Sequence, residues 1–264
     1  MTSAVKLHWV LALLLTAAPA WAKKKPAHAT GKSEHTDSKP AVKTVASEVV
    51  ARYLASIGGP SFTALQTRKA SGEVDFTPTG GVPVKAQVEV WWKAPGKARE
   101  VWLTQDGKLR RTFDGKSAWV QPVKGKKRRL RAAERAEVSR LAALYQPALI
   151  MPLDQLTMEK TETKDGRVLD ILKSPNGDFI WFDAKTALPV RIDLVEERPE
   201  PERAGEFQPT QVYFDDWKFV GATQLPHTLR RVRPDGETIY RFASVEQNLD
   251  AADKLFKKPM WYRR

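Results

Sequence analysis

Five dipeptides of the type Asp-Gly or Asn-Gly constrain the fold of this chain more than any other feature of its sequence. They are Asp106-Gly107, Asp114-Gly115, Asp165-Gly166, Asn176-Gly177 and Asp235-Gly236. Such pairs accept the positive φ angles of two-residue hairpin turns, so each predicts that one strand returns beside the next. We therefore expect an antiparallel meander, because strands and helices do not alternate as parallel crossover units require.

Between these turns the sequence has two different periods. Residues 82–90 and 188–194 alternate apolar and polar side chains, which is typical of strands with one buried face. Residues 45–57 and 132–146 instead have the apolar spacing of helices, ended by Gly58-Gly59 and by Pro147 respectively. The pattern predicts a mainly β (α+β) fold with a sheet of about 9–11 strands and two or three helices on one face.

Residues 1–22 have the pattern of a cleaved secretory leader. Lys6 precedes an apolar run, and Ala20-Trp21-Ala22 supplies the small residues required before a cut, so we expect cleavage after Ala22. A membrane anchor is the alternative, but residues 7–22 include Pro19 and are shorter than the ~20 apolar residues that span a bilayer. The chain has no Cys, which excludes disulfides and an N-terminal lipid anchor. The expected location is the periplasm.

The remaining chain is strongly basic. The full chain has a formal net charge of +13, and loss of the leader, whose one charged residue is Lys6, leaves 13 − 1 = +12. An exported chain meets anionic lipids and cell-wall polymers, so we expect no nucleic-acid partner; a merely solubilising surface is the alternative. Residues 23–43 contain no aromatic side chain and are predicted to be a disordered basic tether, with residues 44–264 as the folded domain.

The sequence offers few groups for catalysis. His227 is the only imidazole outside the leader and the tether, so no His or Cys metal cluster is expected, and a surface or capping role suits this residue best. Adjacent carboxylates, as at Asp215-Asp216, point to opposite faces of a strand. We expect no catalytic residue, no metal and no cofactor, although an Asp/Glu hydrolase of envelope glycans needs no special motif.

Aromatic residues give the strongest indication of a binding site. Trp91 and Trp92 are adjacent on one predicted strand and must face opposite sides, and residues 179–182 repeat this arrangement. Either both faces are ordinary core, or a cavity between sheet and helices stays apolar to hold an acyl chain. The residues expected to line such a cavity are Val88, Val90, Trp92, Trp119, Leu141, Leu144, Tyr145 and Phe182.

Two charged blocks interrupt these patterns. Residues 124–131 (KGKKRRLR) hold six cations, and residues 196–206 hold five Glu. Each block suits a solvated loop, but a basic loop beside the second helix would also suit a lipid phosphate or an acidic partner protein. The candidate residues for an anionic surface or partner are Lys126, Lys127, Arg128 and Arg129.

Several short motifs resemble those of one known family. They are residues 213–217 (YFDDW), 225–227 (LPH) and 244–248 (SVEQN), together with residues 113–119 (FDGKSAW) and the glycines at 58, 59 and 72. In this combination the chain resembles the outer-membrane lipoprotein-sorting (LolA/LolB-like) superfamily over most of residues 45–259. The long basic tether and the loop at residues 124–131 depart from a typical carrier of that superfamily.

The resemblance implies both a fold and a role. The superfamily has a curved antiparallel half-barrel with helices on its concave face, and its members carry, accept or sense acylated lipoproteins. The implied function is a monomeric, non-catalytic periplasmic carrier for acyl chains or lipoproteins. The alternative is an envelope signalling or scaffold protein that docks an acidic partner or an anionic membrane through its basic loop, with a core filled by its own side chains.

Overall fold

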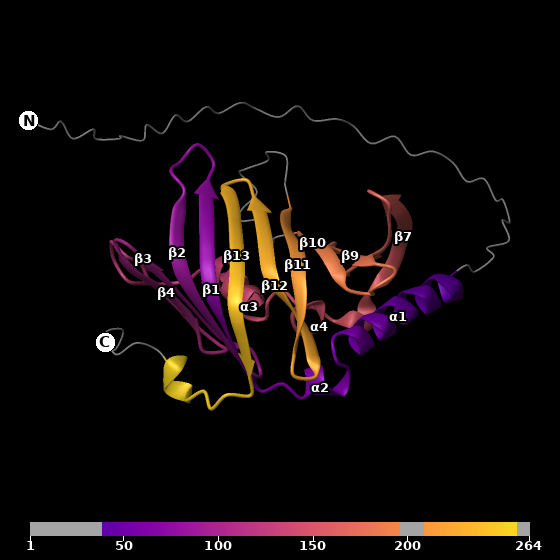
Figure 1. Cartoon of the computed structure of the whole chain (residues 1–264), viewed down its shortest axis with the longest axis horizontal. Helices are drawn as coiled ribbons and strands as arrows, with labels where there is room; N and C mark the ends of the chain where they lie inside the picture. Colours follow the sequence, from indigo (N-terminus) through magenta and orange to yellow (C-terminus); the bar gives the residue numbers. More distant parts are fainter. Residues whose placement is uncertain (1–38, 196–208, 258–264) are drawn as a thin grey trace, which may run out of the picture. The chain divides into compact units, whose positions relative to one another are not determined.

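The computed structural model describes residues 39–195 and 209–257 (Figure 1). The predicted leader, most of the predicted tether and the acidic block at residues 196–206 lie outside these ranges. Within them, no helix is both long enough and apolar enough to cross a membrane.

The described residues form one antiparallel sheet of thirteen strands. The strands of its first half are β1 (Thr67–Pro78), β2 (Val84–Lys93), β3 (Lys97–Thr104), β4 (Gly107–Phe113), β5 (Ala118–Gln121) and β6 (Arg128–Arg129). Those of its second half are β7 (Thr157–Lys164), β8 (Arg167–Lys173), β9 (Phe179–Asp183), β10 (Pro189–Leu194), β11 (Thr210–Val220), β12 (Thr223–Arg233) and β13 (Gly236–Gln247). The spatial order is β6-β5-β4-β3-β2-β1-β13-β12-β11-β10-β9-β8-β7, so β13 joins the two halves.

The sheet is open, because β6 and β7 lie at its two ends and do not pair with each other. This confirms the predicted mainly β fold and its antiparallel half-barrel. The expected number of strands was too low. The reason is that β5 and β6 have only four and two residues, too few to give a period-two pattern.

The predicted hairpins are also confirmed. All five Asp-Gly and Asn-Gly pairs lie at connections between neighbouring antiparallel strands. The turn between β7 and β8 has positive φ at both central residues, with φ of 51° at Asp165 and 74° at Gly166. In the other four pairs only the glycine takes positive φ.

Two helices cover different parts of one sheet face. Helix α1 (Lys39–Ser56) lies beside β7, and its Tyr53 ring is centred 5.3 Å from the ring of Phe182 in β9. Helix α3 (Ala132–Ala142) packs against β2, β3 and β4 and is seen behind the front strands in Figure 1. Short helical turns complete the fold: α2 (Pro60–Thr63), α4 (Pro147–Ile150), η1 (Leu153–Gln155) and η2 (Asp253–Leu255).

Each of the two long helices differs from the prediction at one end: α1 begins earlier, and α3 ends earlier. Helix α1 begins at Lys39, within the segment expected to be a tether, and ends before Gly58 and Gly59, which take positive φ as predicted. The second helix was predicted to continue to residue 146, but α3 ends at Ala142. It ends early because Leu144 and Tyr145 adopt the left-handed conformation, with φ of 49° and 51°.

Candidate functional site

Seven of the eight residues expected to line a cavity lie in one apolar cluster, the core between the sheet and helices α1 and α3. They are Val88, Val90 and Trp92 from β2, Leu141 from α3, Leu144 and Tyr145 from the loop after it, and Phe182 from β9. The eighth, Trp119, is buried but lies outside this cluster. Its neighbours Ala118 and Val120 face the cluster, so the alternation of β5 points Trp119 to the other side of the sheet.

The cluster is filled by the side chains of the chain itself. Leu141, Leu144 and Phe182 have no accessible area, so other atoms of the chain surround each of them. A run of partly accessible apolar side chains covers the cluster next to α3: Ala148, Leu149, Ile150, Met151 and Leu153. An apolar ligand could reach the cluster only if this cover and α3 moved away from the sheet.

The cover is joined to α3 through strained backbone. Leu144 and Tyr145 carry large side chains at positive φ, a conformation that costs about 1–2 kcal/mol per residue. Backbone hydrogen bonds from Leu144 to the Leu141 carbonyl and from Tyr145 to the Arg140 carbonyl hold this turn, at 2.7 and 2.8 Å. Strain of this kind persists only where the surrounding packing imposes it, and it is concentrated at functional segments.

An arginine lies buried beside the apolar cluster. Arg68 of β1 is 1 % exposed, and its guanidinium lies 5.8 Å from the ring centre of Trp92. Its Nη2 donates to the carbonyl oxygen of Ala142, the last residue of α3, at 2.7 Å. Within the described residues its Nε and Nη1 have no hydrogen-bond partner. Burial lowers the pKa of Arg68 to about 9, although the nearby Tyr53 hydroxyl partly opposes this shift.

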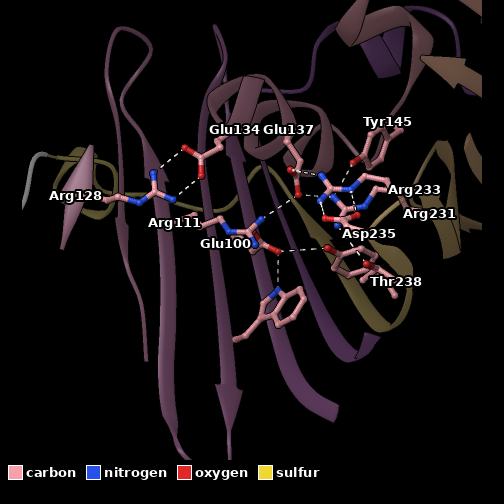
Figure 2. Close-up of polar contacts among 12 residues, drawn as sticks. Glu100, Arg111, Arg128, Glu134, Glu137, Tyr145, Arg231, Arg233, Asp235 and Thr238 are labelled. Carbon is pink, nitrogen blue, oxygen red and sulfur yellow. Dashed lines mark hydrogen bonds and ion pairs between the residues drawn. The ribbon is translucent and has the colours of Figure 1, made fainter. Parts of the chain in front are cut away.

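A second group of charges fixes α3 to the sheet, as Figure 2 shows. The carboxylate of Glu137 lies 3.1 Å from Arg111 of β4 and 2.5 and 2.9 Å from Arg231 and Arg233 of β12. Burial alone would raise the pKa of Glu137, but the attraction of Arg231, Arg111 and Arg233 outweighs it and lowers the pKa to about 2. The carboxylate is therefore charged at any physiological pH.

The same group continues deeper into the sheet. Glu100 of β3 is 1 % exposed, accepts a hydrogen bond from Trp102 Nε1 at 2.6 Å and lies 3.2 Å from Arg111. Attraction to Glu100 raises the pKa of Arg111 despite its burial. On the other side, Arg231 donates to the hydroxyls of Tyr145 and Thr238 at 3.4 and 3.2 Å. Tyr145 is thus linked both to the apolar cluster and to the charges.

Arg68, Glu137 and this charged group were not predicted from the sequence. One signal was available, because Arg231 and Arg233 are two residues apart on a strand and so share a face. In the structure Arg231 is buried and the next strand residue but one before it, Leu229, is buried as well, so this face of β12 lies inside the protein. Two inward-facing arginines require an internal acid, and Glu137 on the helical segment was a candidate for it.

The predicted basic loop is exposed and partly occupied by its own contacts. Lys126, Lys127, Arg128 and Arg129 are all exposed, and the two arginines form β6 at the end of the sheet. Arg128 makes two hydrogen bonds to Glu134 of α3, at 2.8 and 2.6 Å, which lower the pKa of that carboxyl (Figure 2). Arg129 donates to a serine hydroxyl in the β4–β5 connection.

The surface role expected for His227 is wrong. The residue is 6 % exposed and lies within β12, where its Nδ1 is 3.2 Å from the carbonyl oxygen of Leu225. The preceding Leu225 and Pro226 are also buried in this strand.

Solved structures show the same fold as this chain. One is a DUF1329 family protein from Desulfovibrio piger, with a TM-score of 0.55, 14 % identity and coverage of 82 % of this chain and 97 % of that one. Another is a domain described as outer membrane lipoprotein-sorting from Vibrio parahaemolyticus, with a TM-score of 0.54, 10 % identity and coverage of 81 % and 97 %.

A LolA superfamily protein from Nitrosomonas europaea is similar to the same extent, with a TM-score of 0.54, 10 % identity and coverage of 81 % and 97 %. The chain therefore has the LolA-like fold that the motifs suggested. At these identities the similarity concerns the fold alone. No protein-family model matches the chain, and no curated protein matches its sequence.

Proposed function

We propose that this chain is a non-catalytic binding protein of the periplasm that holds an acyl chain or a lipidated protein between the sheet and α3. The observation that carries the proposal is the position of Arg68, a buried cation beside an apolar cluster with two nitrogens, Nε and Nη1, that have no hydrogen-bond partner among the described residues. Leaving a charged group buried without full hydrogen bonding is costly, so such a residue suits a site that a polar ligand group completes.

The chemistry of an acylated ligand fits this site. Its hydrocarbon would replace the apolar contacts of residues 148–153, and each buried methylene contributes about 0.8 kcal/mol. The ester, amide or carboxylate at the head of the chain would accept hydrogen bonds from Arg68. Release of the left-handed turn at Leu144 and Tyr145 would offset part of the cost of opening.

The comparisons support the class of ligand. The Vibrio parahaemolyticus domain with the same fold is described as lipoprotein-sorting, and the leader-like residues 1–22 of this chain suit the same compartment. A monomeric protein of the periplasm would use this fold to hold an acylated ligand between the sheet and α3.

Titration of the full chain with a fluorescent fatty acid tests the proposal. We expect saturable binding that Arg68→Met weakens about tenfold or more, because a charge-assisted hydrogen bond is worth about 1.5–3 kcal/mol. Unfolding of Arg68→Met in urea should show no large loss of stability, since the substitution removes an unneutralised buried charge. If Arg68 had only a structural role, Arg68→Met would leave fatty-acid binding unchanged and would clearly lower the free energy of unfolding.

A second variant tests the cover. Leu149→Glu places a carboxylate on a partly accessible residue of α4, so the closed protein should fold while acyl binding falls at least about tenfold. Leu144→Glu is unsuitable, because Leu144 is fully buried and the carboxylate would destabilise the fold itself. Leu103→Glu is the matched control, since Leu103 is 51 % exposed on β3. Absence of saturable binding to the wild-type chain would contradict the proposal.

The exposed cations at residues 126–129 support a second candidate, docking to an anionic membrane or an acidic envelope protein. The test replaces Lys126 and Lys127, which precede β6, because replacing Arg128 would also break its ion pair with Glu134 of α3. Replacing both lysines with Ser should weaken binding to anionic vesicles mainly at low salt, with each cation worth about 1 kcal/mol near such a surface. Equal binding of variant and wild type at every salt concentration would exclude this role for the two lysines.

A further inference from the structure

A cleft on the sheet face opposite α1 and α3 plays no part in the proposed acyl site. Its volume is about 690 Å³, within the range of small-molecule sites, and its lining comes from the β7–β8 turn and strands β8 to β13. The alternation of side chains along each strand identifies the sheet face on which the cleft lies. Trp181 and Arg230 line the cleft, and each lies between two buried residues that do not line it: Ile180 and Phe182, and Leu229 and Arg231.

Four planar side chains stand side by side across β9 to β12 in this cleft. The guanidinium of Arg191 lies 4.7 Å from the ring centre of Trp181 and 5.6 Å from that of Tyr213. The guanidinium of Arg230 lies 4.0 Å from the ring centre of Tyr213, on which Arg191 also packs. Cation–π contacts of this kind orient the arginines, so their edges, which carry the N–H donors, are available to the cleft.

Cations outnumber acids among the residues that line the cleft. Five lining residues are cationic, and two, Asp165 and Asp215, are acidic. Two of the cations, Lys164 and Arg167, come from the β7–β8 turn, whose left-handed Asp165-Gly166 conformation brings both strand ends to the cleft. The remaining three are arginines of β10, β12 and β13.

These three arginines are preorganised by acids outside the lining. Arg191 makes hydrogen bonds of 2.6 Å from Nε and Nη2 to Asp193, which fixes its plane. Arg230 donates to Glu237 from Nη1 alone at 3.1 Å, so within the described residues its Nε and Nη2 remain available. An arginine held by one carboxylate in this way can still bind a second anion through its other donors.

We propose that this cleft binds a phosphate group, carried either by a lipid head group or by a soluble phosphate ester. Phosphate offers several acceptor oxygens. Nε and Nη2 of Arg230 would bind it through two parallel hydrogen bonds, and Nη1 of Arg191, which Asp193 does not bind, would donate a further one. Trp181 adds a buried Nε1 that has no hydrogen-bond partner within the described residues. The apolar lining residues Leu169 and Ile239 would contact the carbon skeleton of the ligand.

Calorimetry with glycerol 3-phosphate, and co-sedimentation with phosphatidylcholine vesicles that contain phosphatidylglycerol, test the proposal on the full chain. Arg230→Gln should weaken binding about tenfold, because it removes a charge-assisted hydrogen bond. Lys218→Gln is the matched control: it removes the same charge from a residue of β11 that pairs with Asp216 outside the cleft. Its effect should stay within about twofold. Asp215→Asn removes a lining acid and should strengthen binding.

The two probes distinguish the sources of the phosphate. Binding of glycerol 3-phosphate with this pattern of variants supports a site for a soluble phosphate ester, whereas the same pattern with vesicles alone supports a lipid head group. The proposal is overturned if neither probe binds saturably. It is also overturned if Arg230→Gln and Lys218→Gln weaken binding equally, because binding would then reflect only the net charge of the protein.

Discussion

Glu137 is the residue that links α3 most directly to the sheet, because one carboxylate contacts three arginines from two strands. Glu137→Gln leaves these guanidinium groups close together without the anion. We expect a loss of about 3–5 kcal/mol in the free energy of unfolding at neutral pH, measured by urea denaturation. The control is Asp106→Asn, whose pair with Lys124 is largely exposed, and it should cost less than about 1 kcal/mol.

The difference in the free energy of unfolding between wild type and Glu137→Gln should depend on pH, because the pKa of Glu137 is lowered. The folded-state pKa is about 2, below the ordinary value for Glu, so the stabilising contribution is present above about pH 5 and is lost as the pH falls towards 2. The gap in stability between wild type and Glu137→Gln should therefore narrow over that range. A gap that is constant from pH 6 to about pH 2 would contradict the assigned charge.

The candidate site shows what could and could not be predicted at the scale of single residues. Leu141, Leu144 and Phe182 were expected to line a cavity; the structure shows them fully buried among other side chains of the core, and their contact with a ligand stays a prediction. Trp119 was placed on the wrong sheet face because a four-residue strand does not reveal its phase. Arg68 was missed because a single arginine in a strand looks the same in the sequence whether it faces solvent or the interior.

At the scale of elements, close approach of β1 and β13 depends on Gly72. The pairing of these strands shifts between Ser71 and Gly72, and a Cβ at Gly72 would overlap the Arg241 carbonyl oxygen and lie 2.8 Å from Phe242 Cα. Because both obstacles are backbone, Gly72→Ala should destabilise the protein by about 3 kcal/mol in thermal or urea unfolding.

Gly80→Ala is the appropriate comparison for this strand pair. A Cβ at Gly80 has no atom within 4 Å, and only its φ of 68° opposes a side chain, so its cost should stay near 1 kcal/mol. Equal losses for the two variants would show that β1 and β13 can separate freely at the shift in their pairing.

The same scale explains why helix ends were harder to predict than hairpins. An Asp-Gly turn is determined by its own two residues, and all five were placed correctly. The end of α3 depends instead on tertiary contacts. Arg68 binds the Ala142 carbonyl, and the packing of Leu144 and Tyr145 imposes a conformation that neither residue favours.

At the scale of the whole molecule, the sheet separates two faces with different properties. The face under α1 and α3 is apolar and closed, with charges that anchor α3 at Glu137. The opposite face carries the open cleft with its stacked arginines and aromatic rings. The sequence predicted an antiparallel sheet with apolar surfaces, but it did not indicate the cleft, whose lining comes from six strands and a turn. Such a surface depends on strand order, which the turns alone do not determine.

The central claim is that an acyl chain binds between the sheet and α3 rather than elsewhere on the protein. Photo-crosslinking of the full chain with a diazirine-bearing fatty acid, followed by mass spectrometry of the labelled peptides, tests it most directly. We expect crosslinks in residues 141–153 and in β2 of the wild-type protein. Leu149→Glu should abolish these crosslinks, and Leu103→Glu should retain them. Labels confined to the cleft face of β8 to β13, or spread evenly over the surface, would contradict it.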